Sequence, residues 1–338
     1  MTGATAAHHA RQSVRVVRPW VLLSLALVAC GGKLDAGWDE PKGMLPVDDR
    51  NPIVLCNDNY YDNWQGEYAM LLSSTGGLRL AGIVINDSWP WPELDENMAG
   101  WRQMVDAARE GGLRNIPDPL ASTGPVLVRP SDGNIDATVP NRSEGARFII
   151  EASNRLSLPY RPLVVVTGGR LTDLADAYLM DHTLPERIVV VSSLGSATTD
   201  GGEMGIPNGE MDTWADVIVA QKFLYVQVSA FYEQKTDVTA SLLSELPTNA
   251  FTSWIESKEP EVWDDLVAAD QVGVLAVAIP SFVSSVVRVA PPDVGADEIP
   301  TLSSDPGGPV WLVTEVRSAV GTARFWDMLL DPNTYSPE

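Results

Sequence analysis

Asparagine and aspartate side chains are concentrated directly after one apolar run of the chain. The run is 52–56, Pro-Ile-Val-Leu-Cys, and five of the residues in 57–63 are Asn or Asp. A buried strand of this length delivers whatever follows it to the carboxyl edge of a sheet, where open α/β folds place their ligands. Oxygen ligands gathered there are typical of a site for a hard cation such as Ca²⁺. The alternative is an ordinary turn, because Asn and Asp also bond to their own backbone.

Histidine supply limits the catalytic chemistry available to the chain. Of three histidines, His8 and His9 lie in an N-terminal segment that we expect to be removed. His182 lies between a predicted helix and a predicted strand, where we expect a surface or capping role. A Ser-His-Asp or Cys-His mechanism is therefore disfavoured. Carboxylates and a bound metal remain as the means of hydrolysis.

The N-terminus has the pattern of a secretion signal. Three arginines precede the apolar stretch 20–29, which is too short to span a membrane. We expect residues 1–29 to be a signal peptide. Without its three arginines the formal net charge changes from −22 to −25, since −22 − 3 = −25. This acidic balance disfavours nucleic acid as a partner, because phosphate binding needs a basic face.

The end of the signal, Leu-Val-Ala-Cys at 27–30, resembles the bacterial lipobox. The resemblance implies that Cys30 becomes lipidated and that the protein is anchored in the cell envelope, with Gly31 favouring the outer membrane. The segment 30–50, rich in Gly, Asp, Lys and Pro, is then expected to be a flexible tether. Because Cys30 is modified, Cys56 has no disulfide partner, and we predict that it is a small buried hydrophobe.

Apolar runs with the length of strands alternate with segments of helical period. The runs lie at 52–56, 79–85, 162–167, 187–193 and 309–314. Helical periodicity occurs at 64–73, 95–111, 144–156, 171–180, 214–231 and 321–330. The alternation predicts one α/β domain, 51–332, with a mostly parallel, Rossmann-like open central sheet flanked by helices, and a tail at 333–338. The Pro-, Gly- and Asp-rich segments 112–142 and 291–308 are predicted to be loops inside it.

Three further segments place polar residues next to predicted strands or helices. The segment 167–175, Thr-Gly-Gly-Arg-Leu-Thr-Asp-Leu-Ala, joins a strand to a helix. Glu210 and Asp212 precede a helix, and Asp270 precedes another. Each has a structural alternative, which is a Gly-rich turn for the first segment and a helix N-cap for Asp212 and for Asp270.

In this order along the chain, the segments resemble the inosine-uridine-preferring nucleoside hydrolase family over roughly residues 50–332. The segment 56–63 is similar to the family's Asp-x-Asp-Pro-Gly-x-Asp-Asp motif, with Asp58 on its second aspartate and Asp62 and Asn63 on its closing pair. The other segments resemble its Thr-Gly turn, its Glu-x-Asn turn and its His-Asp-x-x-Ala helix. Cys56 stands in place of the first aspartate, and Ala269 in place of the histidine.

The resemblance implies one Ca²⁺ and a riboside bound at the sheet edge. The implied metal ligands are Asp58, Asp62, Asn63, Asp270 and the backbone carbonyl of Thr167. Asp58 would act as the catalytic base toward a metal-bound water. The residues expected to bind sugar hydroxyls are Asp62, Asn86, Glu210, Asp212 and Asp270. One residue is inserted before Leu171 relative to the family, so the carbonyl of Gly168 is the alternative to that of Thr167.

Two functions of different classes are compatible with these residues. The first is Ca²⁺-dependent hydrolysis of the N-glycosidic bond of a ribonucleoside or related riboside at the cell envelope, by a chain that could form a homo-oligomer. The second is a lipoprotein of the same fold that binds a sugar or nucleoside without turnover. Departures at Cys56, Asn63 and Ala269 favour the second, and the retained acids favour the first. The aromatic residues Tyr60, Tyr61, Trp89 and Trp91 could stack on a ligand or simply pack.

Overall fold

The apolar runs of the sequence form the strands of a central sheet. In the computed structural model, residues 40–60, 64–198, 208–229, 245–262, 270–293 and 299–335 are described. Several positions to which the sequence analysis assigned a role lie outside this part: the signal peptide 1–29, Cys30, Tyr61, Asp62, Asn63 and Ala269. Within the described part, none of the helices is both long and apolar enough to cross a membrane.

The sheet is mostly parallel, as predicted. Its order across the described strands is β3-β2-β1-β4-β5-β7-β10-β8-β9-β6. Neighbours from β3 to β10 run parallel, whereas β8 is antiparallel to β10 and to β9. The bounds are β1 Pro52–Asn57, β2 Arg79–Ile85, β3 Pro119–Ala121, β4 Leu163–Thr167, β5 Ile188–Ser193, β6 Ala197–Thr198, β7 Leu224–Val228, β8 Val283–Ala290, β9 Thr301–Ser304 and β10 Val310–Val316.

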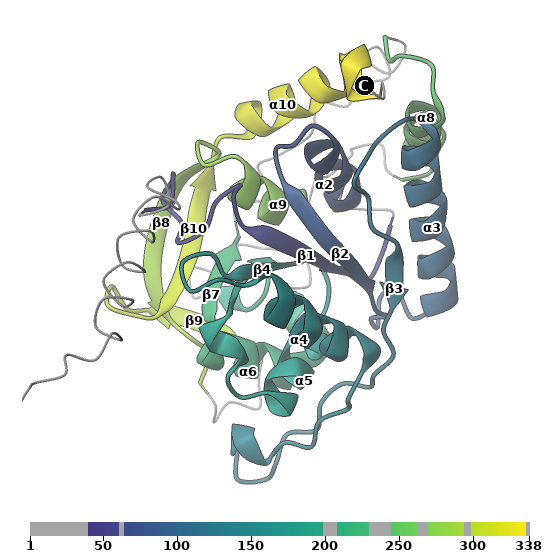
Figure 1. Cartoon of the computed structure of the whole chain (residues 1–338). Helices are drawn as coiled ribbons and strands as arrows, with labels where there is room; N and C mark the ends of the chain where they lie inside the picture. The colour runs from purple at the N-terminus through teal and green to yellow at the C-terminus, as the bar shows by residue number, and fades with distance from the viewer. Residues whose placement is uncertain are drawn as a thin grey trace, which may run out of the picture. The chain divides into compact units, whose positions relative to one another are not determined.

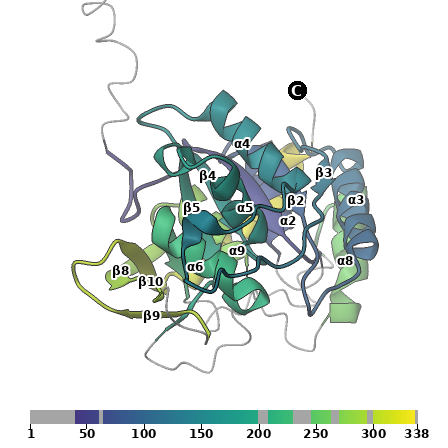
Figure 2. The same ribbon diagram turned by 90° about the horizontal axis from the view of Figure 1, so that it is seen from below.

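Helices cover both faces of the sheet. The helices α4, α5 and α6 lie in front of it in Figure 1, and α2 and α9 lie behind. In both views β8, β9 and β10 lie at one end of the sheet, and α3 and α8 lie at the other (Figures 1 and 2). The bounds are α2 Gln65–Ser74, α3 Leu94–Glu110, α4 Glu144–Leu156, α5 Thr172–Met180, α6 Thr213–Lys222, α8 Ala250–Val262, α9 Gln271–Ala278 and α10 Ser318–Leu330.

Strand β1 shows why the central strands are continuously apolar. All six of its residues are buried. Ile53 and Leu55 pack in a first core with residues of α2, α3, α9 and α10. Val54 and Cys56 pack in a second core with residues of α4, α5 and α6. A strand covered on both faces needs apolar side chains at every position, which is the pattern that the sequence shows. The prediction that Cys56 is a buried hydrophobe is confirmed.

One predicted helix, 214–231, is wrong in its second half. Helix α6 ends at Lys222, and Phe223 takes up extended backbone before β7 begins. Val226 and Val228 pack in the first core, and Tyr225 packs in the second, which is the two-residue period of a strand. A short apolar run fits both periods, so it did not reveal the change of structure. The predicted loop 291–308 likewise contains the short strand β9.

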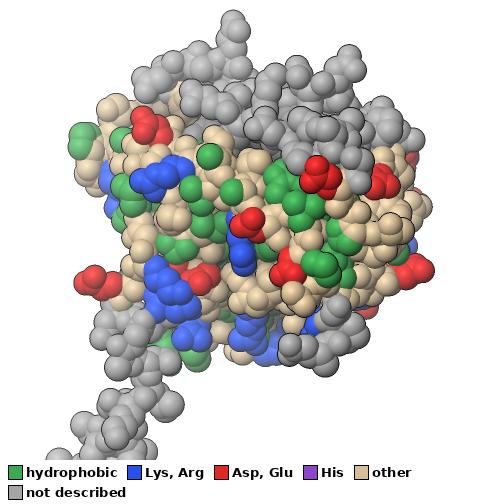
Figure 3. Space-filling view, turned by 90° about the horizontal axis from the view of Figure 1, so that it is seen from above, with side chains coloured by type: hydrophobic (Ala, Val, Ile, Leu, Met, Phe, Trp, Pro, Cys, Tyr) green, Lys and Arg blue, Asp and Glu red, His purple; other side chains and the backbone are tan. Residues whose placement is uncertain are grey.

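The compact unit that contains the sheet begins before the predicted domain boundary at residue 51. Residues from Pro41 onward belong to one compact unit. Leu45 and Val47, which fall in the segment expected to be a tether, are buried in the first core. The Asp48 carboxylate accepts hydrogen bonds from the backbone N–H groups of Lys42 and Arg50. Charged side chains of both signs lie among hydrophobic ones on the face shown in Figure 3.

Candidate functional site

Strands β1 and β4 lie side by side, and their carboxyl ends bring distant residues together. Cys56 pairs with Thr167 in the parallel register, and the Gly168 N–H donates a hydrogen bond of 2.9 Å to the Cys56 carbonyl. Asp58 therefore leaves the sheet beside Gly168. This is the edge at which the sequence predicted a ligand site.

Two consecutive glycines contact two carboxyl groups at this edge. A Cβ atom placed on Gly168 would lie 2.6 Å from both Cγ and Oδ2 of Asp270. A Cβ atom on Gly169 would lie 3.1 Å from Cγ of Asp58. A side chain at position 168 would force Asp270 to move, and one at position 169 would require a shift of a few tenths of an ångström at Asp58. The structure thus brings Asp58, the Thr167 turn and Asp270 together, and we call Asp58, Thr167, Gly168, Gly169 and Asp270 the glycine edge.

Hydrogen bonds to the backbone hold the two acids of the glycine edge in place. The Asn57 side-chain oxygen accepts from the Asp58 N–H at 2.7 Å, and its amide nitrogen donates to Gln65 Oε1 at 2.9 Å. Gln65 Nε2 donates to the Asp270 carbonyl at 3.4 Å, and Ser193 Oγ donates to the same carbonyl at 2.7 Å. Asn57 therefore makes the turn that the sequence offered as an alternative. The turn positions Asp58 and does not exclude a ligand there.

The Thr167 side chain stabilises the turn itself. Its hydroxyl donates to the Gly169 carbonyl at 3.0 Å. Thr167 and the two glycines leave the sheet together, at the same edge as Asp58. Sequence reasoning identified Thr167 but missed Asn57, Gln65 and Ser193. The one available signal was an Asn at the exit of a buried strand.

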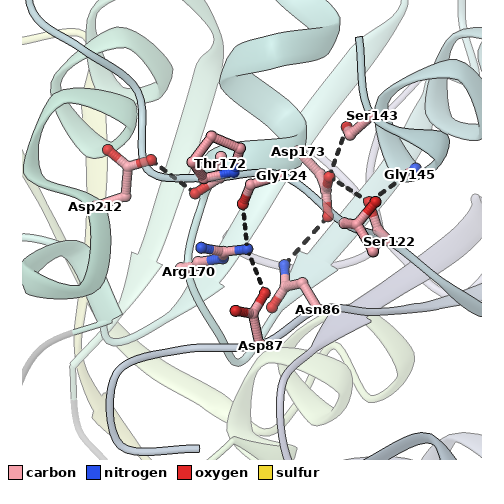
Figure 4. Close-up of polar contacts among 12 residues, drawn as sticks. Asn86, Asp87, Ser122, Gly124, Ser143, Gly145, Arg170, Thr172, Asp173 and Asp212 are labelled. Atoms are coloured by element: carbon pink, nitrogen blue, oxygen red, sulfur yellow. Dashed lines mark hydrogen bonds and ion pairs between the residues drawn. The ribbon is translucent and has the colours of Figure 1, made fainter. Parts of the chain in front are cut away.

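A second group of buried acids belongs to α5 and α6, and groups of the protein donate hydrogen bonds to their carboxylates. Asp173 accepts from Ser122 Oγ at 2.6 Å, from Ser143 Oγ at 2.8 Å and from Asn86 Nδ2 at 3.2 Å (Figure 4). Asp176 accepts from the Ser143 N–H and hydroxyl. We call Asp173, Asp176, Asp212 and Asp216 the buried acid cluster.

Asp212 caps α6, which was the structural alternative for this residue. Its Oδ1 accepts from the Ala215 N–H at 3.0 Å, and its Oδ2 accepts from Thr172 Oγ1 at 2.7 Å and the Leu127 N–H at 2.9 Å. Burial raises the pKa of Asp212 and, together with the charge of Asp212, raises the pKa of Asp216 to about 7. Both carboxyls are thus built into the protein interior.

Solved structures carry the same fold. An "Inosine-Guanosine Nucleoside Hydrolase (IG-NH)" matches with a TM-score of 0.59 and 18% identity, over 82% of this chain and 98% of that one. The inosine-uridine preferring nucleoside hydrolase from Bacillus anthracis matches with a TM-score of 0.55 and 15% identity, over 82% and 97%. The fold is that of the nucleoside hydrolases.

Other comparisons show that the likeness is one of fold and not of sequence. The type III effector protein XopQ, solved in complex with adenosine diphosphate ribose, matches with a TM-score of 0.52 and 12% identity over 95% of this chain and 100% of that one. No family model and no curated protein matches the sequence. At such identities the nucleoside-hydrolase fold is shared, and the chemistry must be argued from this chain's own residues.

The donors at the glycine edge fit an oxygen-ligated cation. The carboxylates of Asp58 and Asp270 and the carbonyl of Thr167 are the hard oxygen ligands that Ca²⁺ takes in proteins. No group of three His, Cys, Asp or Glu side chains suited to a metal occurs within the described ranges. The remaining predicted ligands, Asp62 and Asn63, lie outside those ranges, so the full set of ligands stays a prediction.

Asn86 lies beside the glycine edge. The sugar-binding role of Glu210 and Asp212 stays a prediction. The Asn86 N–H donates to the Asn57 carbonyl at 3.0 Å, which places it beside the turn that holds Asp58. Its Oδ1 atom is buried and has no hydrogen-bond partner in the described part of the chain. Glu210 is half-buried in a 3₁₀ turn, Asn208–Asp212, that leads into α6.

Arg170 follows directly on the glycine edge, and the sequence reasoning gave it no role. Its side chain is 6% exposed. Its guanidinium donates at 2.6 Å to Asp87 Oδ1 and at 2.6 Å to the Gly124 carbonyl (Figure 4). The one sequence signal for a role of Arg170 was a charged residue directly after two glycines, at the position of the insertion relative to the family.

The remaining candidates divide between surface and core. Trp89 follows β2 and is 59% exposed, so it is free to contact a ligand. Tyr60 is half-buried against α3, where a Cβ atom on Gly100 would collide with its ring. Exposed His182 stacks on the Tyr178 ring with centroids 4.8 Å apart, which confirms its surface role. Burial raises the pKa of the Cys56 thiol, and nearby Asp173 raises it further.

Proposed function

We propose that the chain hydrolyses the N-glycosidic bond of a ribonucleoside or related riboside at the glycine edge. The observation that carries the proposal is the close approach of Asp270 to Gly168 and of Asp58 to Gly169, at the carboxyl ends of β1 and β4. The fold it shares with nucleoside hydrolases supports the same reaction. One of its structural neighbours, XopQ, was solved with a riboside that carries phosphates.

Asp58 is the proposed base. Its backbone is fixed by Asn57, so its carboxylate is preorganised to accept a proton from water that attacks the anomeric carbon. The carboxylates of Asp58 and Asp270 would stabilise the positive charge that develops on the sugar ring. Asn86 Oδ1, buried and unpartnered within the described residues, is placed to accept from a sugar hydroxyl.

A Ca²⁺ ion is the proposed cofactor. Asp58, Asp270 and the Thr167 carbonyl would hold it, with Asp62 and Asn63 as the further predicted ligands. When bound, such an ion lowers the pKa of a coordinated water and fixes its position. Asn63 provides a neutral oxygen where the family motif has a carboxylate, so we expect weaker binding of Ca²⁺ than an all-aspartate set would give.

A binding protein without turnover is the second candidate. The observation that favours it is the position of Cys56, whose side chain packs in the second core and supplies no acid to the glycine edge. His182 is remote from the edge, because it follows the far end of α5, so it cannot protonate a leaving base there. On this alternative Asp58 and Asp270 bind a sugar and its cation, and no bond is cleaved.

We also propose where the protein acts. The lipobox-like end of segment 1–29 supports lipidation at Cys30 and anchoring in the bacterial cell envelope, with a small nucleoside or sugar as the ligand. Incorporation of a labelled fatty acid tests the anchor. Loss of the label in Cys30→Ser would support it, and an equally labelled variant would refute it.

The test of function is release of reducing sugar from a panel of ribonucleosides by the full-length protein in detergent, with Ca²⁺ and with a chelator. We expect Ca²⁺-dependent release, reduced at least about 100-fold in Asp58→Asn, because a general base contributes about that much or more. Asp95→Asn, an exposed acid on α3, is the matched control and should retain full activity.

Two outcomes would count against hydrolysis. Ribose or Ca²⁺ binding in calorimetry, without release from any nucleoside, would replace hydrolysis by the binding alternative. Absence of both release and binding would remove the proposed function altogether.

A further inference from the structure

Arg170 brings a buried positive charge next to a carboxylate-rich edge. Gly169, its neighbour in the chain, contacts Asp58, and the guanidinium reaches across to the segment that follows β2. Burial of a guanidinium is unfavourable unless its donors are matched. The N–H groups of a buried arginine are expected to meet acceptors, whether these belong to the protein, to water or to a ligand.

The pairing around Arg170 is incomplete in the described residues. Its Nε atom is buried and has no hydrogen-bond partner there. Two neighbours on the segment after β2 share this property: Asn86 Oδ1 and Ser88 Oγ are also buried without partners in the same part of the chain. One donor, one acceptor and one hydroxyl are therefore left unmatched beside the glycine edge. Each such atom calls for a hydrogen-bond partner, and a single polar ligand can supply partners to three of them on neighbouring residues.

The acid that bonds directly to Arg170, Asp87, is one that a ligand can replace. The Asp87 carboxylate bonds to a single guanidinium nitrogen, and its side chain is 38% exposed. Because Asp87 is partly exposed, water can solvate its carboxylate when it leaves the pair. An anionic group on a ligand could therefore replace Asp87, engage the Nε–H as well, and form the two-pronged contact that guanidinium makes with phosphate.

We propose that the site binds a phosphorylated riboside, with Arg170 as the residue that binds its phosphate. This rests on the proposed function, in which the 2′ and 3′ hydroxyls of the sugar face the carboxylates of the glycine edge. The 5′ position then remains to carry the phosphate. Asn86 and Ser88 supply the acceptor and the hydroxyl that hydrogen-bond to the sugar. The substrate class is a ribonucleoside 5′-phosphate rather than the bare nucleoside.

The probes are ribose, ribose 5-phosphate and inorganic phosphate, titrated calorimetrically into the full-length protein. We expect ribose 5-phosphate to bind at least about tenfold more tightly than ribose, because a charge-assisted pair contributes roughly that factor. Arg170→Gln should reduce the preference to less than about twofold while ribose binding stays unchanged. Arg288→Gln is the matched control. Arg288 also has a buried Nε without a partner among the described contacts, but it lies in β8 over the ring of Trp311 in β10.

A second variant separates a binding role from a purely structural one. Asp87→Asn removes the competing carboxylate, so it should tighten ribose 5-phosphate binding several-fold and leave ribose binding unchanged. If Arg170 only anchors the loop, Asp87→Asn would weaken both ligands or neither. This arm keeps the proposal testable if Arg170→Gln does not fold.

The outcomes distinguish this proposal from the proposed function. Equal affinity for ribose and its 5-phosphate, or a preference that survives Arg170→Gln, would overturn the phosphate role and leave riboside binding intact. Binding of inorganic phosphate and of ribose 5-phosphate without any binding of ribose would also overturn it, because the protein would then recognise the phosphate alone and not the riboside. Failure of all three probes to bind, together with no nucleoside hydrolysis, would remove both proposals.

Discussion

Acidic side chains are buried in two neighbouring parts of this molecule and are held there in different ways. In the buried acid cluster, hydroxyl and N–H groups of the protein donate directly to the carboxylates, as Ser122 and Ser143 do to Asp173. At the glycine edge, hydrogen bonds with the side chains of Asn57 and Ser193 fix the backbone of Asp58 and of Asp270. Their carboxyls lie against Gly168 and Gly169.

The difference separates a structural acid from one placed for a ligand. A carboxylate whose oxygens already accept several short hydrogen bonds stabilises the fold, and removing it leaves buried donors unmatched. An acid at the carboxyl edge of a parallel sheet lies in the part of the fold where ligands bind. Burial alone therefore does not reveal function, and the place of the acid in the fold must be considered as well.

The largest expected effect is that of Gly168→Ala. The new Cβ would lie 2.6 Å from Oδ2 of Asp270, so the Asp270 side chain must move. A displacement of about 1 Å at a reacting site can reduce turnover roughly 100-fold, and we expect riboside hydrolysis to fall by about that factor. Gly307→Ala, where only Asp305 lies within ordinary contact distance, is the control and should leave the rate unchanged. An unaffected rate in Gly168→Ala would place the catalytic acids elsewhere.

Asp173→Asn tests the other half of the comparison and should act on stability. Its NH₂ group would replace one of the two carboxylate oxygens, which accept from Asn86 on one side and from Ser122 and Ser143 on the other, so at least one of these donors would lose its acceptor. Chemical denaturation should show a loss of about 2 kcal/mol in the free energy of unfolding, as for other disrupted buried hydrogen bonds to charge. Exposed Asp95→Asn should change it by less than about 0.5 kcal/mol. Full stability in Asp173→Asn would show that the buried acid cluster is not structural.

Several parts of this architecture follow from the sequence. The runs at β1, β2 and β4 are continuous and apolar because helices cover both faces of the sheet, which the sequence pattern expresses directly. Asp58 follows such a run by two residues, so its place at the carboxyl edge could be predicted. Asp270 could be expected nearby only through the family resemblance, because nothing local to it shows which strand end it will meet.

Other parts depend on contacts between segments that the sequence does not pair. The bond between Thr172 and Asp212 joins residues 40 positions apart, and that between Asn86 and Asp173 joins residues 87 apart. Each of these residues also suits a cap or a turn, so its type alone does not select the partner. Arg170 shows the same limit. A charged residue beside two glycines is expected to be exposed, and the sequence does not show that the segment after β2 covers it.

A third prediction concerns the pH dependence of stability in the buried acid cluster. Burial, with the charge of Asp212, raises the pKa of Asp216 from 3.8 to about 7 in the folded protein. The native state then binds more protons than the unfolded state between these values, so stability falls as pH rises through this window. Asp216→Asn should flatten the decline, by at most about 1.4 kcal/mol per pH unit, and should raise the melting temperature at pH 8. A slope equal to that of wild type would show that Asp216 does not titrate there.

The most direct test of the glycine edge is the rise in melting temperature on addition of Ca²⁺ to the full-length protein, compared among wild type, Asp270→Asn and Asp176→Asn. A ligand that binds only the native state raises stability by RT ln(1 + [L]/Kd). The Asp176 carboxylate accepts from Ser143, so this variant controls for the loss of a buried acid. We predict a Ca²⁺-dependent rise that Asp270→Asn removes and Asp176→Asn retains. An equal rise in all three proteins would contradict the assignment of the glycine edge as the cation and riboside site.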